Sequence, residues 1–134
     1  MFRRRMFLNL AVLAATPAAA WAQGGHGHAH AAHGGQVQKI GQYEVEFLTR
    51  DGQIMVYVLD EQDRPVDASQ FRATAVVLAR GNEQRSVDLS PSGENRLAAR
   101  LEFPVEARVR ATVTLRAAAG SEVGRARFTF DQPR

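Results

Sequence analysis

The sequence contains no cysteine. It therefore has no disulfide bridge, no thiolate nucleophile for catalysis, and no thiolate ligands of the kind that bind copper(I) or a structural zinc ion. Methionine is also scarce, and only Met55 lies outside residues 1–22. That methionine sits in an apolar run rich in β-formers, so we expect it to be a core residue. This argues against a methionine-based copper(I) carrier.

A membrane-spanning segment is missing as well, although the chain begins with an apolar stretch. Residues 1–22 contain a positively charged start, a short apolar run and a final series of small residues. A spanning helix needs about 20 apolar residues, whereas Ala20 and Ala22 fit the small-residue pattern of a cleavage site. We therefore predict a signal peptide that is cleaved before Gln23, and export to the periplasm. The paired arginines of this segment permit the twin-arginine route, but we favour the general secretory route. Every basic residue of the chain except Lys39 is an arginine, so a pair of arginines is not a specific signal here.

A surplus of positive charge is present only in the signal segment. The whole chain has 17 Lys and Arg residues against 14 Asp and Glu residues. Three of the basic residues and none of the acidic ones lie in residues 1–22, so the expected mature chain has 14 of each. Without a basic surplus we expect no binding to nucleic acid or acidic lipid. We also expect no membrane span in the mature chain.

Histidine is absent after residue 33, and the whole set falls within the stretch GGHGHAHAAHGG. Imidazole is a good ligand for Zn(II), Cu(II) and Ni(II), and the glycine and alanine spacers allow several rings to converge on one ion. Because a flexible arm loses conformational freedom when it wraps an ion, we expect modest affinity, suited to buffering or hand-over. The predicted ligands of a divalent transition metal ion (Cu, Zn, Ni or Co) are His26, His28, His30 and His33. A tighter amino-terminal site for Cu(II) or Ni(II), formed by Gly24-Gly25-His26, would require cleavage after Gln23 rather than before it. The open alternative is a flexible linker whose histidines bind nothing.

Helical periodicity is lacking after the signal segment, and strand periodicity takes its place. Apolar and polar residues alternate in residues 43–47 and 109–115, and the Asp51-Gly52 pair between two apolar runs is a hairpin signal. About seven strands separated by turn signals predict an all-β domain, an immunoglobulin-like β-sandwich, in residues 36–134. A small Greek-key barrel is the main alternative. Residues 23–35 then form a flexible arm rich in histidine and glycine.

Acidic side chains offer no convincing second site. Four of them crowd residues 60–67, but the ligand pattern of a calcium loop is missing, so we expect a solvated loop. Glu44 and Glu46 point the same way from one strand; they could complete a metal site with the arm, but a plain solvent-exposed face is favoured. A catalytic triad is not credible, because every histidine lies in the arm and catalysis needs groups held in place. We therefore predict that the protein is not an enzyme.

The run HGGQVQKIGQYEVEFL, followed by DGQIMVYVLDEQDRPVDAS, resembles a segment of small exported bacterial proteins and of the amino-terminal regions of some periplasmic adaptor subunits of heavy-metal efflux pumps. The matching residues are His33-Gly34-Gly35, Gly41, Tyr43, Glu46, Asp60 and Pro65-Val66-Asp67. The resemblance covers roughly residues 33–115. It implies a periplasmic β-domain that takes part in handling copper, zinc, cobalt or nickel. The chain lacks the helical hairpin and the lipoyl-type halves of a full adaptor, so it cannot bridge a pump alone.

These patterns favour a periplasmic metal-binding protein that buffers divalent transition metal ions or passes them on in heavy-metal resistance or efflux. Its partner would be a periplasmic efflux adaptor or another envelope protein. The alternative is a non-catalytic interaction module of the cell envelope, docked through a strand edge or face, whose histidine arm is only a linker. If one histidine is held against the fold, near Glu44 or Glu46, we expect it to be His33, because it lies where the β-domain begins.

Overall fold

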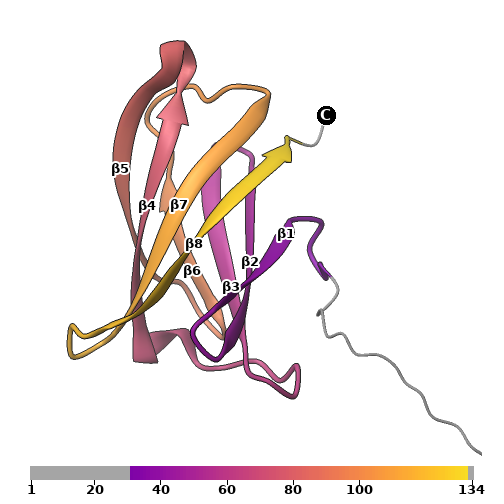
Figure 1. Ribbon diagram of the computed structural model, residues 1–134, viewed down its shortest axis with the longest axis vertical. Helices are drawn as coiled ribbons and strands as arrows, with labels where there is room; N and C mark the ends of the chain where they lie inside the picture. The colour runs from indigo at the N-terminus through magenta and orange to yellow at the C-terminus, as the bar shows by residue number, and fades with distance from the viewer. Residues whose placement is uncertain (1–30, 133–134) are drawn as a thin grey trace, which may run out of the picture.

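Alternating apolar and polar residues form eight antiparallel strands in the part of the chain that the computed structural model describes, residues 31–132 (Figure 1). The strands are β1 (Gln36–Ile40), β2 (Tyr43–Arg50), β3 (Gln53–Leu59), β4 (Phe71–Ala79), β5 (Glu83–Pro91), β6 (Arg96–Arg100), β7 (Arg108–Ala117) and β8 (Glu122–Asp131). Two short 3-10 turns, η2 (Ala68–Gln70) and η3 (Arg80–Asn82), flank β4. Within these residues no helix has the length and apolar character needed to cross a membrane. The prediction of an all-β domain is confirmed.

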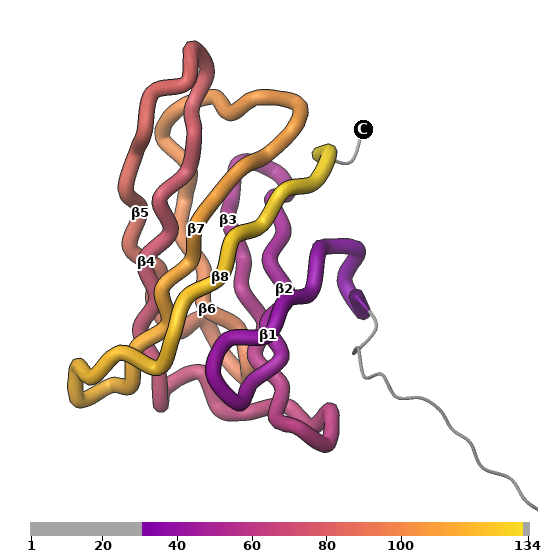
Figure 2. The backbone as a smooth tube through the Cα atoms, in the orientation of Figure 1, coloured from indigo at the N-terminus to yellow at the C-terminus, as the bar shows by residue number. Residues whose placement is uncertain are grey.

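The strands follow the order β1-β2-β3-β6-β5-β4-β7-β8 in one sheet, which curls until its outer strands β1 and β8 lie beside each other (Figures 1 and 2). β4, β5 and β6 form consecutive antiparallel pairs, while β3 lies beside β6 and β7 lies beside β4. This is Greek-key connectivity. Between β1 and β8, the backbone N–H of Thr129 donates a hydrogen bond to the side chain of Gln36 at 2.8 Å. The sheet is therefore nearly closed and barrel-like.

The strand count corrects the sequence-based estimate of about seven. The additional strand is β1, whose only apolar residues are Val37 and Ile40, so its alternating pattern is weak. All five of its residues nevertheless pair with β2. The turn that follows requires glycine, because Gly41 has a φ of +61° and a Cβ atom there would lie 2.9 Å from the side chain of Val123. This close approach packs the β1–β2 turn against β8.

The interior of the barrel is filled by the inward-facing residues of the alternating pattern. Phe47 on β2 and Phe128 on β8 are fully buried, and their rings stack with centroids 5.2 Å apart. Valines from the intervening strands complete the same cluster, among them Val56, Val77 and Val113. Burying one side chain of this size contributes roughly 1.5–3 kcal/mol. The core therefore fixes β2 and β3, the two strands that carry the candidate site.

Part of the outer surface is also buried. Glu46 and Leu48 on β2 and Met55 on β3 alternate with the core residues and face outward, yet they are 5%, 1% and 8% exposed. Residues 31–35, just before β1, lie over Glu46 and Leu48: the N–H groups of His33 and Gly35 bind Glu46, and Gly35 approaches the side chain of Leu48. Met55 is buried as expected, but on the outward face of β3 and outside the core cluster. The covered face of β2 and β3 holds the candidate site.

Candidate functional site

Glu46 is the only buried charged side chain among residues 31–132. It lies in β2, opposite Val37 of β1 and Tyr57 of β3. The sequence favoured a solvent-exposed face for Glu44 and Glu46, and this is wrong for Glu46, because the chain before β1 folds over it. Glu44 is half-buried. A buried carboxylate is tolerated only when it is hydrogen-bonded, so the partners of Glu46 define the site.

The carboxylate of Glu46 holds the turn that precedes β1. Its Oε2 atom accepts hydrogen bonds from the backbone N–H groups of His33 at 2.9 Å and Gly35 at 2.8 Å. The turn is closed by a hydrogen bond from the Gly34 N–H to the Ala31 carbonyl at 3.2 Å. The carboxylate of Glu46 thus accepts from two backbone N–H groups that would otherwise lack a partner, and these N–H groups stabilise its buried charge. The turn and Glu46 therefore depend on each other.

Both glycines after His33 are required by this geometry. Gly34 has a φ of +87°, in the left-handed region that side chains disfavour. Gly35 has no room for a side chain, because a Cβ atom would lie 2.3 Å from the backbone carbonyl oxygen of Phe47. The His-Gly-Gly motif therefore has a physical basis. It lets the backbone approach β2 closely enough for Glu46 to bind the turn.

His33 is fixed by three contacts, two to its imidazole and one to its backbone carbonyl. Its Nδ1 atom lies 2.9 Å from Oε1 of Glu46, and its ring stacks on Tyr57 with centroids 3.6 Å apart and planes 5° apart. The carbonyl of His33 accepts a hydrogen bond from the Arg50 guanidinium at 2.9 Å. The His33 side chain is 40% exposed, against 6% for the side chain of Glu46. Only the outer part of the ring therefore faces solvent.

The contact with Glu46 determines which ring nitrogen of His33 carries the proton. An ionised carboxylate can only accept hydrogen bonds, so Nδ1 is the donor and carries the hydrogen. In the neutral imidazole, Nε2 is then left with its lone pair. A histidine that donates Nδ1–H to a carboxylate and presents Nε2 has the arrangement found at protein metal centres. This ring is thus oriented to act as a ligand or a base.

Two hollows border the His33 ring. A small one of about 40 Å³ lies between the ring, Tyr57, Glu44 and Asn95. A larger, open one of about 440 Å³ lies toward the β5–β6 turn, where Glu94 is among its lining residues. The ring therefore has free space beside it, into which a further ligand or a neighbouring segment could enter.

The other predicted ligands, His26, His28 and His30, lie outside the described residues. Within residues 31–132, no three side chains of His, Cys, Asp or Glu come together in a group that could hold a metal ion. The prediction that His33 is held against the fold near Glu44 or Glu46 is confirmed, with Glu46 as the partner. His33 is thus one oriented donor whose described surroundings do not complete a ligand set.

The acidic loop between β3 and β4 stabilises its own backbone. The Oδ1 atom of Asp60 accepts hydrogen bonds from the N–H groups of Gln62 and Arg64. Asp67 caps η2 by accepting a hydrogen bond from the Ser69 N–H at 2.9 Å. The hydrogen bond from the Arg64 backbone is the largest effect that lowers the pKa of Asp60, and the one from Ser69 does the same for the pKa of Asp67. These carboxylates act as turn and cap residues.

Sequence reasoning missed the roles of Tyr57 and Arg50. Tyr57 lies in the apolar run that forms β3, and nothing in this run indicates a stacking partner. Arg50 lies at the end of β2, and nothing in the sequence indicates that its guanidinium donates a hydrogen bond to the backbone carbonyl of His33. The signal that could have revealed the site was the Gly-Gly pair itself, because two glycines beside a histidine indicate a close backbone approach.

No protein-family model, no curated protein and no solved structure matches this chain.

Proposed function

We propose that this chain is a periplasmic metal-binding protein that buffers or hands over divalent transition metal ions in heavy-metal resistance or efflux. The observation that best supports this proposal is the 2.9 Å contact between Nδ1 of His33 and Glu46. This contact leaves the lone pair of Nε2 free to bind a metal ion. In this proposal His33 is the anchor ligand, and the remaining ligands come from His26, His28 and His30. The ion is one of those that prefer imidazole: Cu, Zn, Ni or Co.

Orientation of His33 supports this proposal energetically. A ligand on a free chain loses rotamer and backbone freedom when it binds an ion. The stacking on Tyr57 and the hydrogen bond to Glu46 impose this order before any ion arrives. Carboxylate partners of this kind change metal affinity by about 10–100-fold when they are removed. One anchored histidine therefore gives the arm a defined point at which to begin binding.

The other histidines are close enough along the chain to complete the site. His30 precedes His33 by three residues, a span of at most about 10 Å between Cα atoms. Alternate spacing through glycine and alanine lets His26 and His28 approach the same ion without bulky side chains between them. Because the composition of residues 23–35 predicts a flexible arm, we expect ordering of the other three ligands to keep the affinity modest, which suits hand-over.

The cellular setting is also part of the proposal. The signal-like residues 1–22 support export, and the His-Gly-Gly start of the domain is the motif that resembles periplasmic adaptors of heavy-metal efflux pumps. The partner is then a periplasmic efflux adaptor or another envelope protein, and the chain is not an enzyme.

We also propose that the domain is related to the immunoglobulin-like β-sandwiches. This relationship draws support from the β5–β6 junction, which pairs through only two residue pairs and so divides the barrel-like sheet into two halves.

Isothermal titration of the chain from Gln23 onward with Cu(II), Ni(II) and Zn(II) tests this function. We expect at least one ion to bind more tightly than about millimolar, as several imidazoles on one chain allow. His33→Gln retains a donor for Glu46 and should weaken binding about tenfold. A variant with alanine at residues 26, 28 and 30 should weaken it further. Binding no tighter than millimolar, or equal binding by all three proteins, would overturn the proposal.

The second candidate is a non-catalytic interaction module whose histidine arm is only a linker. It is favoured by two arginines on the outer face of β7 and β8, Arg110 and Arg127, which have no carboxylate partner among residues 31–132 and do not line the hollows beside His33. Under this function the titrations show no specific metal binding, whereas a partner docks on the barrel. The two candidates are separated by the His33→Gln titration, because a linker is indifferent to that substitution.

A further inference from the structure

The outer face of the β7–β8 hairpin carries a local excess of positive charge. Five arginines lie in β7 and β8, against two acidic residues, Glu122 and Asp131. Both acids are already paired: Asp131 with Arg108 at 3.2 Å and Glu122 with Arg125 at 3.4 Å. The remaining arginines of the hairpin have no ion pair with any carboxylate in residues 31–132. This charge is notable in a chain whose expected mature form is neutral.

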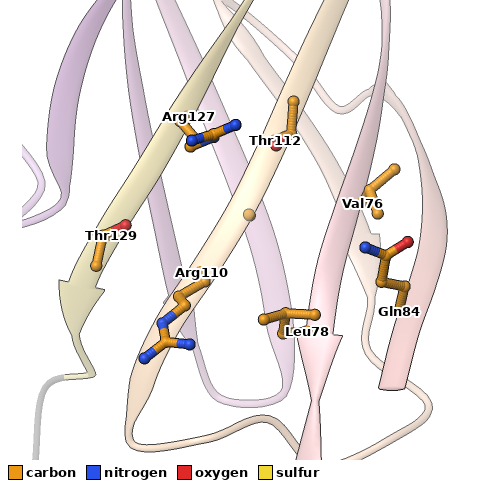
Figure 3. Close-up of a pocket in the computed structure, with 8 residues that line it drawn as sticks. Val76, Leu78, Gln84, Arg110, Thr112, Arg127 and Thr129 are labelled. Atoms are coloured by element: carbon orange, nitrogen blue, oxygen red, sulfur yellow. The ribbon is translucent and has the colours of Figure 1, made fainter. Parts of the chain in front are cut away.

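Two of the unpaired arginines border a shallow hollow of about 250 Å³ (Figure 3). Arg110 comes from β7 and Arg127 from β8, with Val76 and Leu78 of β4 on the other side of the hollow. Val76 is 37% exposed, and it is the only large hydrophobic residue among residues 31–132 that is exposed to solvent rather than buried or half-buried. The hollow thus combines two cationic groups with a small apolar area.

The register of the strands makes the two arginines near neighbours on the outer face of the sheet. Arg110 pairs with Thr129, and Thr112 pairs with Arg127, so the arginines are diagonal neighbours across the ladder. Such neighbours lie about 7–8 Å apart, within reach of long side chains. Like charges at this spacing repel each other, and both side chains are exposed without a carboxylate partner. A carboxylate placed between them would relieve this repulsion.

We propose that this face of β4, β7 and β8 binds an acidic segment of a partner protein. Its carboxylates would bridge Arg110 and Arg127, and a neighbouring apolar side chain would cover Val76 and Leu78. The planar guanidinium fork matches a carboxylate through two parallel hydrogen bonds. This site is independent of the proposed metal function, since it shares no residue with the surroundings of His33.

Among the residues that line the hollow, the number of unpaired cations favours a protein segment over a polyanion or a membrane. Proteins that bind nucleic acid through phosphate contacts commonly use about 6–10 of them. Clusters that recognise acidic membranes contain about 4–8 Lys or Arg residues. The hollow offers two unpaired guanidinium groups beside an apolar area, which suits one or two carboxylates with an adjacent apolar side chain.

The test uses a short acetylated peptide in which glutamate and leucine alternate, labelled for fluorescence anisotropy. The chain from Gln23 onward is measured in a metal chelator, so that metal binding plays no part. Arg110→Gln with Arg127→Gln should weaken binding about tenfold, as expected for the loss of two exposed charge pairs. Lys39→Gln with Arg100→Gln is the matched control, because it removes the same charge from exposed positions on other strands. The control should bind within about twofold of the original chain.

Several outcomes would overturn this site. Equal weakening in both double variants would mean that only net charge matters. Equal binding of a peptide with glutamine in place of glutamate would remove the role of the carboxylates. If the chain binds phosphatidylglycerol vesicles more tightly than the peptide, and this binding depends on Arg110, the ligand of this face is a membrane and not a protein segment. Circular dichroism of each variant checks that the barrel is intact, and none of these results depends on His33.

Discussion

The imidazole of His33 lies flat on the phenol ring of Tyr57, with centroids 3.6 Å apart and planes 5° apart. The two residues come from different parts of the chain, because His33 precedes the first strand whereas Tyr57 lies in β3. Their stacking joins the end of the histidine-rich arm to the barrel. It also fixes the plane of the imidazole, while Glu46 fixes its rotation within that plane.

Substitutions of Tyr57 separate the role of stacking from that of the hydroxyl group. Tyr57→Phe keeps the ring, so we expect metal affinity within about twofold of the original chain. Tyr57→Ala removes the stacking surface, and we expect metal affinity to fall about tenfold as His33 loses its orientation. It should also lower the free energy of unfolding by about 1–3 kcal/mol, less than for a fully buried aromatic residue. Titration calorimetry and urea unfolding measure both effects, and unchanged affinity in Tyr57→Ala would limit Tyr57 to packing.

Glu46 can be altered so that charge and hydrogen bonding are tested separately. Glu46→Gln keeps the size and one acceptor oxygen, but its amide N–H₂ can face Nδ1 of His33 and shift the ring proton to Nε2. We therefore expect metal affinity to fall about 10–100-fold while the barrel remains folded. Glu46→Ala leaves the N–H groups of His33 and Gly35 without their acceptor, at a cost of about 2–4 kcal/mol in the free energy of unfolding. Equal metal affinity of Glu46→Gln and the original chain would contradict the assigned role of Glu46.

The loop that contains Asp60 gives the protein an acid-dependent contribution to stability. The Arg64 backbone N–H holds the pKa of Asp60 below its ordinary value of 3.8. A lowered folded pKa adds stability above the unfolded pKa, and this stability is lost as the pH falls through the folded pKa. Below about pH 4, the original chain should therefore lose more stability than Asp60→Asn. Urea midpoints at pH 7 and pH 3 measure this, with Asp63→Asn as control, and parallel losses in all three proteins would refute it.

The sequence predicted most of the fold because the inward face of each strand is regular. Alternation in β2 and β7 and the turn signals between strands were sufficient for an all-β domain. The eighth strand was missed because β1 has only two apolar residues and is held by ladder hydrogen bonds with β2, which side-chain patterns do not record. The sequence left a sandwich and a small Greek-key barrel as alternatives, because closure of the sheet depends on contacts such as the one between Thr129 and Gln36.

The candidate site was only partly visible in the sequence. His33 and its position near Glu46 could be predicted, because the motif lies where the domain begins and Glu46 lies in the first strongly alternating strand. The burial of Glu46 could not be predicted, because alternation assigns a residue to one face of the sheet but does not show what covers that face. The covering turn is made by residues 31–35, which have no period of their own. Only the folded chain brings their backbone donors to the carboxylate.

Gly35 provides a further test of the contact between the arm and the barrel. A Cβ atom at this position would lie 2.3 Å from the carbonyl oxygen of Phe47, so Gly35→Ala must displace the turn from β2. We expect a loss of about 2–4 kcal/mol in the free energy of unfolding, because the buried Glu46 then loses its backbone donors. Metal affinity should fall as well, since His33 is no longer held on Tyr57. Gly52→Ala is the control: its φ is +74° but no atom lies within 4 Å of the added Cβ, so it should cost only the backbone strain of about 1–2 kcal/mol and leave metal affinity unchanged. If the two variants bind metal equally well, anchoring of the turn does not contribute to metal binding.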